Sequence, residues 1–270
     1  MPELPEVETT RRGIEPHILE RNFTAVVVRD ARLRWPVAAD LARHLVGQRV
    51  LAVRRRAKYL LIDTASGTLI VHLGMSGSLR VVAQEIPPQA YDHIDWQFDN
   101  GLCLRLRDPR RFGAALWTPA AATHPLLADL GPEPWDPEFT GVYLYGKSRK
   151  RVRAVKDFIM DSHVVAGVGN IYASEALFAA GIDPRRPAGR LAARRYERLA
   201  HAIRDTLERA IAAGGTTLRD FLGSDGRPGY FRHALQVYGR AGAPCAQCRG
   251  VVKSITIGAR STFFCPRCQK

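Results

Sequence analysis

The chain has 270 residues, 46% of them hydrophobic, and this length allows one large or two modest domains, each with its own core. Its 40 Lys and Arg residues against 26 Asp and Glu give a formal net charge of +14, which favours a polyanionic partner. No apolar run reaches the roughly 18 residues of a membrane span, and the acidic start is unlike a signal peptide. We therefore expect a globular, cytoplasmic protein.

The chain begins MPELPEVE, which has two interpretations. A helix start explains it, because Pro5 suits a first helical position and Glu6 suits the first turn. The second interpretation depends on Pro2, which becomes the chain end if Met1 is removed. A secondary amine would then lie beside Glu3 and Glu6.

Residues from about 20 to 118 contain short, β-branched, alternating runs separated by turn signals such as ASG, DNG and DPRRFG. This pattern predicts an antiparallel sandwich or barrel. One helical interruption is expected, at residues 38–48.

The character changes after this region, because a Pro-rich stretch precedes apolar residues at helical spacing. The predicted helices are 153–161, 170–181, 191–215 and 217–223. The expected organisation is an N-terminal β domain at 1–125, a linker at 126–140, a helical domain at 141–230 and a cysteine module at 235–270.

Four of the five cysteines lie in the last 26 residues, and Cys103 stands alone. Two C-x-x-C pairs are separated by residues 249–264, which is the spacing of a tetrahedral four-thiolate zinc site. We expect one structural zinc ion, because so short a segment cannot hold a hairpin by its own burial. The ligands would be Cys245, Cys248, Cys265 and Cys268.

Between the two cysteine pairs, SITIGARSTFF predicts strand, tight turn and strand, with residues 258–261 at the tip. Arg260 has two interpretations at this point. It is either a solvated turn residue or a contact to phosphate or a DNA groove.

Two basic clusters occur in different domains. Arg54, Arg55, Arg56 and Lys58 occupy four of five positions in a predicted strand, and residues 147–156 hold six basic side chains. Each cluster could be a solvated face, but two on one chain fit a phosphate backbone crossing both domains.

A Gly-rich approach precedes the helix predicted to start at residue 170. Gly167 and Gly169 allow a tight turn, and Asn170 is expected to cap the helix. Such a start binds phosphate well, although an ordinary cap has the same pattern. The surrounding positive charge favours the phosphate interpretation.

Taken together, these segments resemble the bacterial formamidopyrimidine-DNA glycosylases, which remove oxidised purines from DNA. The matching stretches are MPELPEVET, RRAKYLL, HLGMSGSLR, DPRRFG, GVGNIYASEALF and the terminal cysteine pairs, in the family's order. The resemblance implies an α+β multi-domain protein: an antiparallel β-sandwich, a helix–two-turn–helix domain and a β-hairpin zinc finger. It also implies double-stranded DNA as partner and a monomer.

The resemblance implies a bifunctional glycosylase and abasic-site lyase. Pro2 would be the nucleophile, forming a Schiff base that leads to β,δ-elimination. Glu3 would move protons at the sugar, with Glu6 as a second acid, and Lys58 would hold the phosphate beside the lesion. Arg260 is counted with these residues as a phosphate ligand at the catalytic centre.

Further DNA contacts follow from the same resemblance. Met75, Arg110 and Phe112 would fill the gap left by an extruded nucleotide, although core packing is the alternative for the methionine and the phenylalanine. His72 and Asn170 would bind phosphate. Lys156 would lie near the lesion, and a loop at 217–230 would close over the flipped base.

Two competing functions remain open. A non-enzymatic zinc protein that binds DNA would explain the charge and the cysteines, but not Pro2 beside Glu3. A related glycosylase for oxidised pyrimidines is the other alternative, although DPRRFG and Leu4 favour the purine enzyme. Ser76 stands where some relatives carry an acidic residue, which leaves base recognition open.

Overall fold

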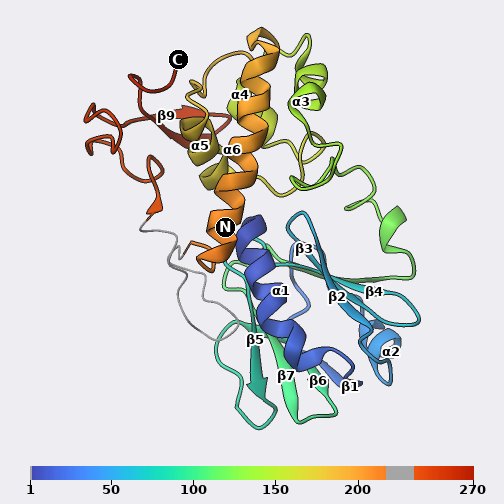
Figure 1. Cartoon of the computed structure of the whole chain (residues 1–270). Helices are drawn as coiled ribbons and strands as arrows, with labels where there is room; N and C mark the ends of the chain where they lie inside the picture. The colour runs from blue at the N-terminus through green and yellow to red at the C-terminus, as the bar shows by residue number, and fades with distance from the viewer. Residues whose placement is uncertain (1, 217–233) are drawn as a thin grey trace. The chain divides into compact units, whose positions relative to one another are not determined.

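The computed structural model describes residues 2–216 and 234–270, and the chain divides into two compact units (Figure 1). Among the described residues, unit 1 contains 2–128 and 213–216, and unit 2 contains 129–212 and 234–270. The predicted helix 217–223 and the loop expected at 217–230 lie outside the described residues.

Unit 1 begins with helix α1, Leu4–Ile18. Glu3 is the N-cap and forms a capping box with Glu6, so each satisfies a backbone N–H that the first turn leaves unpaired. Pro5 is the second helical residue, where its missing N–H costs nothing. The helix buries Val7 and Ile14 among other apolar side chains. The helix-start interpretation of MPELPEVE is confirmed.

Two four-stranded antiparallel sheets form the rest of unit 1. One has the order β1-β6-β7-β5 and the other β2-β3-β4-β8, which confirms the predicted sandwich. The first contains β1 (Phe23–Val28), β6 (Asp92–Phe98), β7 (Leu102–Arg107) and β5 (Ser78–Ala83). The second contains β2 (Ala52–Arg56), β3 (Tyr59–Asp63), β4 (Thr68–His72) and β8 (Ala114–Thr118). The expected helical interruption is α2, Leu41–Leu45, and η1 is a short 3-10 turn at Ala121–Thr123.

Alternate side chains of both sheets face one apolar core. In β6, Ile94 and Trp96 are fully buried in this core, while Asp95 between them points to the other face. Helix α1 contributes to the same cluster. The period-two pattern in the sequence therefore gives the sandwich its interior.

Unit 2 is helical up to its cysteine module. It contains α3 (Gly141–Ser148), α4 (Val155–Ile159), α5 (Asn170–Ala179), η2 (Ala188–Arg190) and α6 (Ala193–Ala212). Helix α3 was not expected as a separate element, and the segment expected to be a linker contains Phe139, which is fully buried. No helix within residues 2–216 and 234–270 could cross a membrane.

The cysteine module carries a two-stranded hairpin of β9 (Lys253–Ile257) and β10 (Arg260–Phe264). Arg260 pairs with Ile257, so the turn contains only Gly258 and Ala259, both with positive φ. The predicted tip at 258–261 was too long. Arg260 and Ser261 already belong to β10, because the tight turn needs only two residues.

Candidate functional site

The start of the chain is held by the buried carboxylate of Glu6. One oxygen accepts the backbone N–H of Glu3 at 2.9 Å, and the other accepts the backbone N–H and hydroxyl of Thr216 at 2.8 and 2.9 Å. Gly215 has a φ of +80°, and a Cβ there would lie 3.0 Å from the Glu6 carboxylate. Pro2 and Glu3 are themselves buried. The residues at the chain start are thereby fixed to both α1 and residues 215–216.

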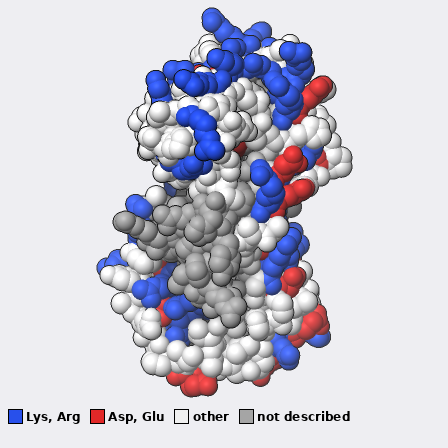
Figure 2. Space-filling view, turned by 60° about the vertical axis from the view of Figure 1, so that its left-hand side comes forward, with Lys and Arg blue, Asp and Glu red and all other residues white. Residues whose placement is uncertain are grey.

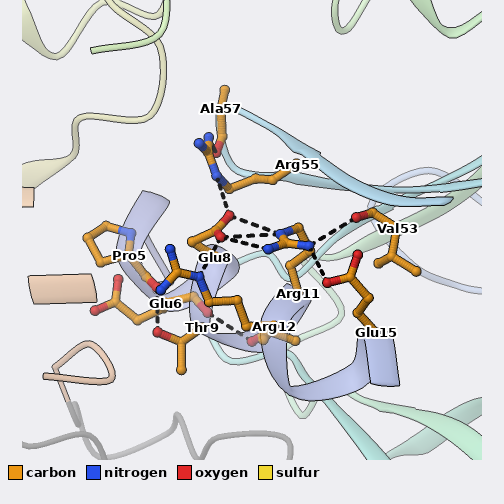
Figure 3. A network of polar contacts seen from close by, with 11 residues as sticks. Pro5, Glu6, Glu8, Thr9, Arg11, Arg12, Glu15, Val53, Arg55 and Ala57 are labelled. Atoms are coloured by element: carbon orange, nitrogen blue, oxygen red, sulfur yellow. Dashed lines mark hydrogen bonds and ion pairs between the residues drawn. The ribbon is translucent and has the colours of Figure 1, made fainter. Parts of the chain in front are cut away.

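A second carboxylate on α1, that of Glu8, gathers three arginines (Figure 3). It pairs with Arg11 at 3.0 Å, Arg12 at 2.8 Å and Arg55 at 3.2 Å. Burial opposes ionisation of Glu8, but the hydrogen bonds from Arg11 and Arg12 hold its pKa below the ordinary value. Arg55 also donates to the carbonyl of Ala57 at 3.0 Å. This network joins α1 to the β2–β3 turn.

Lys58 lies in that turn, so its predicted position within a strand was wrong. The strands pair from Arg56 to Tyr59, and Ala57 before the lysine has a φ of +52°. In the same basic cluster, Arg54 is bonded to Asp63 at 2.8 Å. With Arg55 bonded to α1 as well, both of these cations are engaged within unit 1, which contradicts a uniformly solvated basic face.

His72 ends β4, and its ring lies 4.9 Å from that of Tyr59. Burial, followed by the charges of Lys58 and Arg34, lowers the pKa of His72 to about 4. The backbone N–H of Gly74 donates to Nδ1 at 3.1 Å. The neutral ring therefore carries its proton on Nε2 and presents a donor there.

The two loops that carry Met75, Arg110 and Phe112 are joined by the fully buried carboxylate of Asp108. One of its oxygens accepts the Ser76 hydroxyl at 2.8 Å and the Arg110 N–H at 3.3 Å. The other accepts the Gly113 N–H at 2.7 Å. Ser76 is thus a structural link between the loops.

Met75 and Phe112 are 38% and 42% exposed, so the core-packing alternative is wrong for both. Gly74 has a φ of +62°, and a Cβ there would lie 2.4 Å from the Phe112 carbonyl carbon. The two loops therefore touch through backbone. The Arg110 guanidinium lies 4.9 Å from the Phe112 ring centroid. The structure therefore places these three exposed residues on two loops that touch.

In unit 2, Lys156 is fully buried and its ammonium joins three segments. It donates to Asn170 Oδ1 at 2.5 Å, to Thr262 Oγ1 at 2.7 Å and to the Ser261 carbonyl at 3.2 Å. These bonds connect α4, the start of α5 and strand β10. The predicted cap was wrong by one residue, because Gly169 is the N-cap and Asn170 begins the helix.

The same region holds the segment that leads into the cysteine module. Asn170 Nδ2 lies 3.1 Å from the Ser261 carbonyl and 3.4 Å from the Tyr238 hydroxyl. The buried Glu175 carboxylate accepts three consecutive backbone N–H groups, of Gln236, Val237 and Tyr238, at 2.8 to 3.0 Å. Burial raises the pKa of Glu175 despite these bonds. Helix α5 therefore anchors the module through both Asn170 and Glu175.

The four cysteines fit one zinc ion. Their ligand sulfur atoms all lie within 4.8 Å of one another, with Cys245 and Cys268 3.8 Å apart and Cys248 and Cys265 3.5 Å apart. A tetrahedral site with Zn–S bonds of about 2.3 Å separates its sulfur atoms by about 3.8 Å. Arg260 is exposed at the start of β10, and its guanidinium makes no ion pair among the described residues.

Sequence reasoning missed the residues that position this machinery. Asp108 had a signal, because an Asp before Pro109 is typical of a turn that its own side chain closes. Thr216 and Glu175 had none, because their partners lie 210 and 61 to 63 residues away. Long-range pairing of this kind is not visible in local sequence.

Comparisons with known proteins agree across the whole length. The formamidopyrimidine-DNA glycosylase N-terminal domain matches residues 1–115, its H2TH domain residues 130–222, and a zinc finger found in Fpg and isoleucyl-tRNA synthetase residues 242–270. The formamidopyrimidine-DNA glycosylase of Stenotrophomonas maltophilia is 57% identical over 270 residues, which is 100% of both chains.

Two solved structures are also similar. The MutM (Fpg) protein of Thermus thermophilus is 39% identical with a TM-score of 0.89, covering 99% of this chain and 98% of that one. The Lactococcus lactis Fpg bound to DNA with an abasic site is 32% identical with a TM-score of 0.91, and all of both chains is covered. The sequence similarity over the full length, the fold and the order of the domains all agree. This chain therefore belongs to the formamidopyrimidine-DNA glycosylase family.

Proposed function

We propose that this protein is a bifunctional DNA glycosylase and abasic-site lyase that excises oxidised purines, 8-oxoguanine and formamidopyrimidines, from duplex DNA. Family membership supports the class of activity, and a relative has been solved on DNA containing an abasic site. The observation that carries the proposal is the fixed chain start, where Glu6 and Thr216 hold Glu3 beside Pro2. We expect it to act as a monomer in the cytoplasm, on the nucleoid.

Pro2 is the proposed nucleophile once Met1 is removed. An α-amine has a pKa of roughly 7.7 to 8.0, so a useful fraction is unprotonated near neutral pH. Its lone pair attacks C1′ of the damaged nucleotide, and the base leaves with the electrons of its bond to C1′ and is protonated. The bond between C1′ and O4′ then opens, a proton goes to O4′, and an iminium forms between C1′ and the Pro2 nitrogen. The iminium acidifies the C2′ proton, and removal of that proton expels the 3′ phosphate. The conjugated iminium that results acidifies the C4′ proton, and its removal expels the 5′ phosphate.

Glu3 is the proposed proton carrier at the sugar, and its carboxylate stabilises the cation that appears during reaction. A second acid near the site was expected at Glu6, and that role stays a prediction. Its two oxygens already accept from Glu3 and Thr216, so we assign it to holding the chain start in place. Precise placement matters, because a shift of about 1 Å can cost about 100-fold in rate.

Lys58 and His72 are the proposed ligands of a phosphate beside the lesion. The charge of Lys58 contributes to the low pKa of His72, which places the two groups in each other's field. At neutral pH the lysine supplies charge, and the neutral histidine supplies its Nε2–H. A phosphate between them would accept hydrogen bonds from both the lysine ammonium and the histidine Nε2–H.

Met75, Arg110 and Phe112 are proposed to occupy the gap left by the extruded nucleotide. Their exposure together at two touching loops supports this assignment. The apolar side chains can wedge between base steps, and Arg110 can bond the orphaned partner base. Asp108 holds the two loops in register for this purpose.

On unit 2, Asn170 and Arg260 are proposed to bind DNA phosphates. The phosphate bound by Arg260 is the one expected at the catalytic centre. Contact between Lys156 and the lesion stays a prediction. The three oxygen atoms around its ammonium support a positioning role, in which it holds Asn170 and β10 for DNA. The zinc ion supplies the stability of the hairpin that presents Arg260.

Borohydride trapping tests the proposal. An iminium enzyme becomes covalently joined to an 8-oxoguanine duplex, whereas a DNA-binding zinc protein does not. Pro2→Gly should lose most trapping and strand cleavage while still binding an abasic-site analogue. Pro36→Gly makes the same substitution at an exposed position and serves as the control.

Two outcomes would contradict the proposal. Unchanged cleavage by protein whose N-terminus is blocked, as verified by mass spectrometry, would rule out the nucleophile. Faster reaction on thymine glycol than on 8-oxoguanine duplexes would favour the glycosylase for oxidised pyrimidines.

A further inference from the structure

A cluster of basic side chains covers the end of unit 2 at which α6 begins. Figure 2 shows Lys and Arg gathered over this end, at the top of the view. Six of them are exposed, and none forms an ion pair with another described residue. We call this set the α6 basic surface: Lys150, Arg151, Arg186, Arg190, Arg194 and Arg198.

The surface is continuous although three segments contribute to it. The N–H of Gly189 donates to the Arg151 carbonyl at 2.8 Å, and the N–H of Val155 donates to the Arg186 carbonyl at 2.7 Å. These bonds hold the segment after α3 against η2. The first turn of α6 follows directly in the chain.

Mutual repulsion marks the surface as positively charged. Burial and then the charges of Arg186, Arg198 and Arg194 lower the pKa of Arg195, which lies among them. Arg195 itself donates to the carbonyl of Lys270 at 2.5 Å. The shift shows that Arg186, Arg194 and Arg198 lie close to one another around Arg195.

The part of the α6 basic surface on the first turn of α6 lies at the far end of α5 from Asn170. Asn170 begins α5, and Gly181 follows its last turn. The carbonyl of Gly181 accepts the Lys270 N–H at 3.2 Å, and Lys270 is bonded in turn to Arg195. Ten helical residues span about 15 Å, so the first turn of α6 is separate from Asn170 on unit 2.

We propose that the α6 basic surface binds the phosphate backbone of undamaged double-stranded DNA, outside the segment that contains the lesion. Exposed, unpaired arginines match phosphates, and they carry no information about base sequence. The surface would hold the protein on DNA while lesions are sought, and would not take part in excision. The inference rests on the proposed function only in taking DNA as the partner.

Salt dependence tests the inference. We compare Arg190→Gln/Arg194→Gln with the charge-matched control Arg21→Gln/Arg43→Gln, whose arginines are exposed in unit 1. Binding to an undamaged 40-bp duplex is measured between 50 and 200 mM salt. Each lost phosphate contact reduces the slope of log K against log salt by about 0.9, so the first variant should lose about 2 and the control much less.

The second readout is cleavage of a 12-bp duplex with 8-oxoguanine, which both variants should perform at the wild-type rate. Equal slopes for the two variants would overturn the inference. Loss of 12-bp cleavage in the first variant alone would also overturn it, since the surface would then belong to the lesion site. If the wild type does not cleave at all, the proposed function fails while the binding comparison still decides this inference.

Discussion

The sandwich of unit 1 and the cysteine module of unit 2 hold their functional side chains in different ways. The sandwich rests on 22 buried apolar residues drawn from both sheets, α1 and the segments that join them. The cluster that holds the module has five buried residues: one is Phe178 of α5, and two of the other four are the zinc ligands Cys245 and Cys265. A large apolar core tolerates local change, whereas a small one depends on its metal.

Buried polar groups add a second difference. In unit 1, the carboxylates of Glu6 and Asp108 accept hydrogen bonds from the segments they hold. In unit 2, the buried ammonium of Lys156 donates to α5 and β10, in addition to the Glu175 carboxylate, which accepts from the segment before the cysteine module. The substitutions that follow test how far each unit depends on its buried polar groups and on its metal.

The largest effect is expected from Cys248→Ala. Loss of one thiolate should release zinc and unfold the hairpin, because structural zinc contributes on the order of 10 kcal/mol to such modules. Elemental analysis should fall from one zinc per chain to none, and binding to lesion DNA should weaken at least tenfold. Calorimetry should still show the transition of the sandwich.

Cys103→Ala is the matched control, since this cysteine is fully buried in unit 1. It should retain zinc and lower the melting of the sandwich only. A Cys248→Ala protein that keeps its metal and binds normally would contradict the comparison.

Lys156→Met should have the next largest effect. Methionine fills a similar volume but leaves the Asn170, Ser261 and Thr262 oxygens without their shared donor, which costs about 2 to 4 kcal/mol. Unit 2 should melt earlier and bind DNA more weakly, while the exposed Lys253→Met changes little. Normal melting with loss of excision alone would instead support direct contact of Lys156 with the lesion.

Asp108→Asn should act on unit 1 alone. The new amide NH2 can be directed at the Ser76 side or at the Gly113 N–H, and either way one acceptor is lost, at a cost of about 1 to 3 kcal/mol. The Arg110 loop should shift, lowering 8-oxoguanine excision and compressing the difference between cytosine and adenine opposite it. Asp129→Asn, at an exposed carboxylate, is the control. An unchanged preference between cytosine and adenine would show that Arg110 does not read the opposite base.

His72→Gln should give the smallest effect on the free energy of unfolding, and only at low pH. The folded-state pKa of His72 is lowered to about 4, below its ordinary value. The unfolded chain therefore binds more protons between these values, and wild-type stability falls as the pH drops from about 6.5 to 4. The variant should recover about 1 to 2 kcal/mol at pH 5 relative to pH 7, as measured by urea unfolding. Identical pH profiles would show that the histidine is not held neutral.

Local signals in the sequence were sufficient for the elements and for the metal site. Period-two alternation predicted the sandwich, helical spacing predicted α4, α5 and α6, and the cysteine spacing predicted the zinc ligands. The motif order was enough to identify the family. Each of these signals is short in range, because it depends on side chains that are neighbours on one element or one turn.

Tertiary structure decided which polar side chains are committed inside the protein and which are presented to a partner. Asp108, Glu175 and Lys156 look like ordinary charged residues in the sequence, yet each is buried and binds groups distant in the chain. Met75 and Phe112 look like core residues, yet both are exposed. Composition and spacing set the hydrophobic pattern, but the partner of a buried charge depends on which segments the fold brings within hydrogen-bond distance.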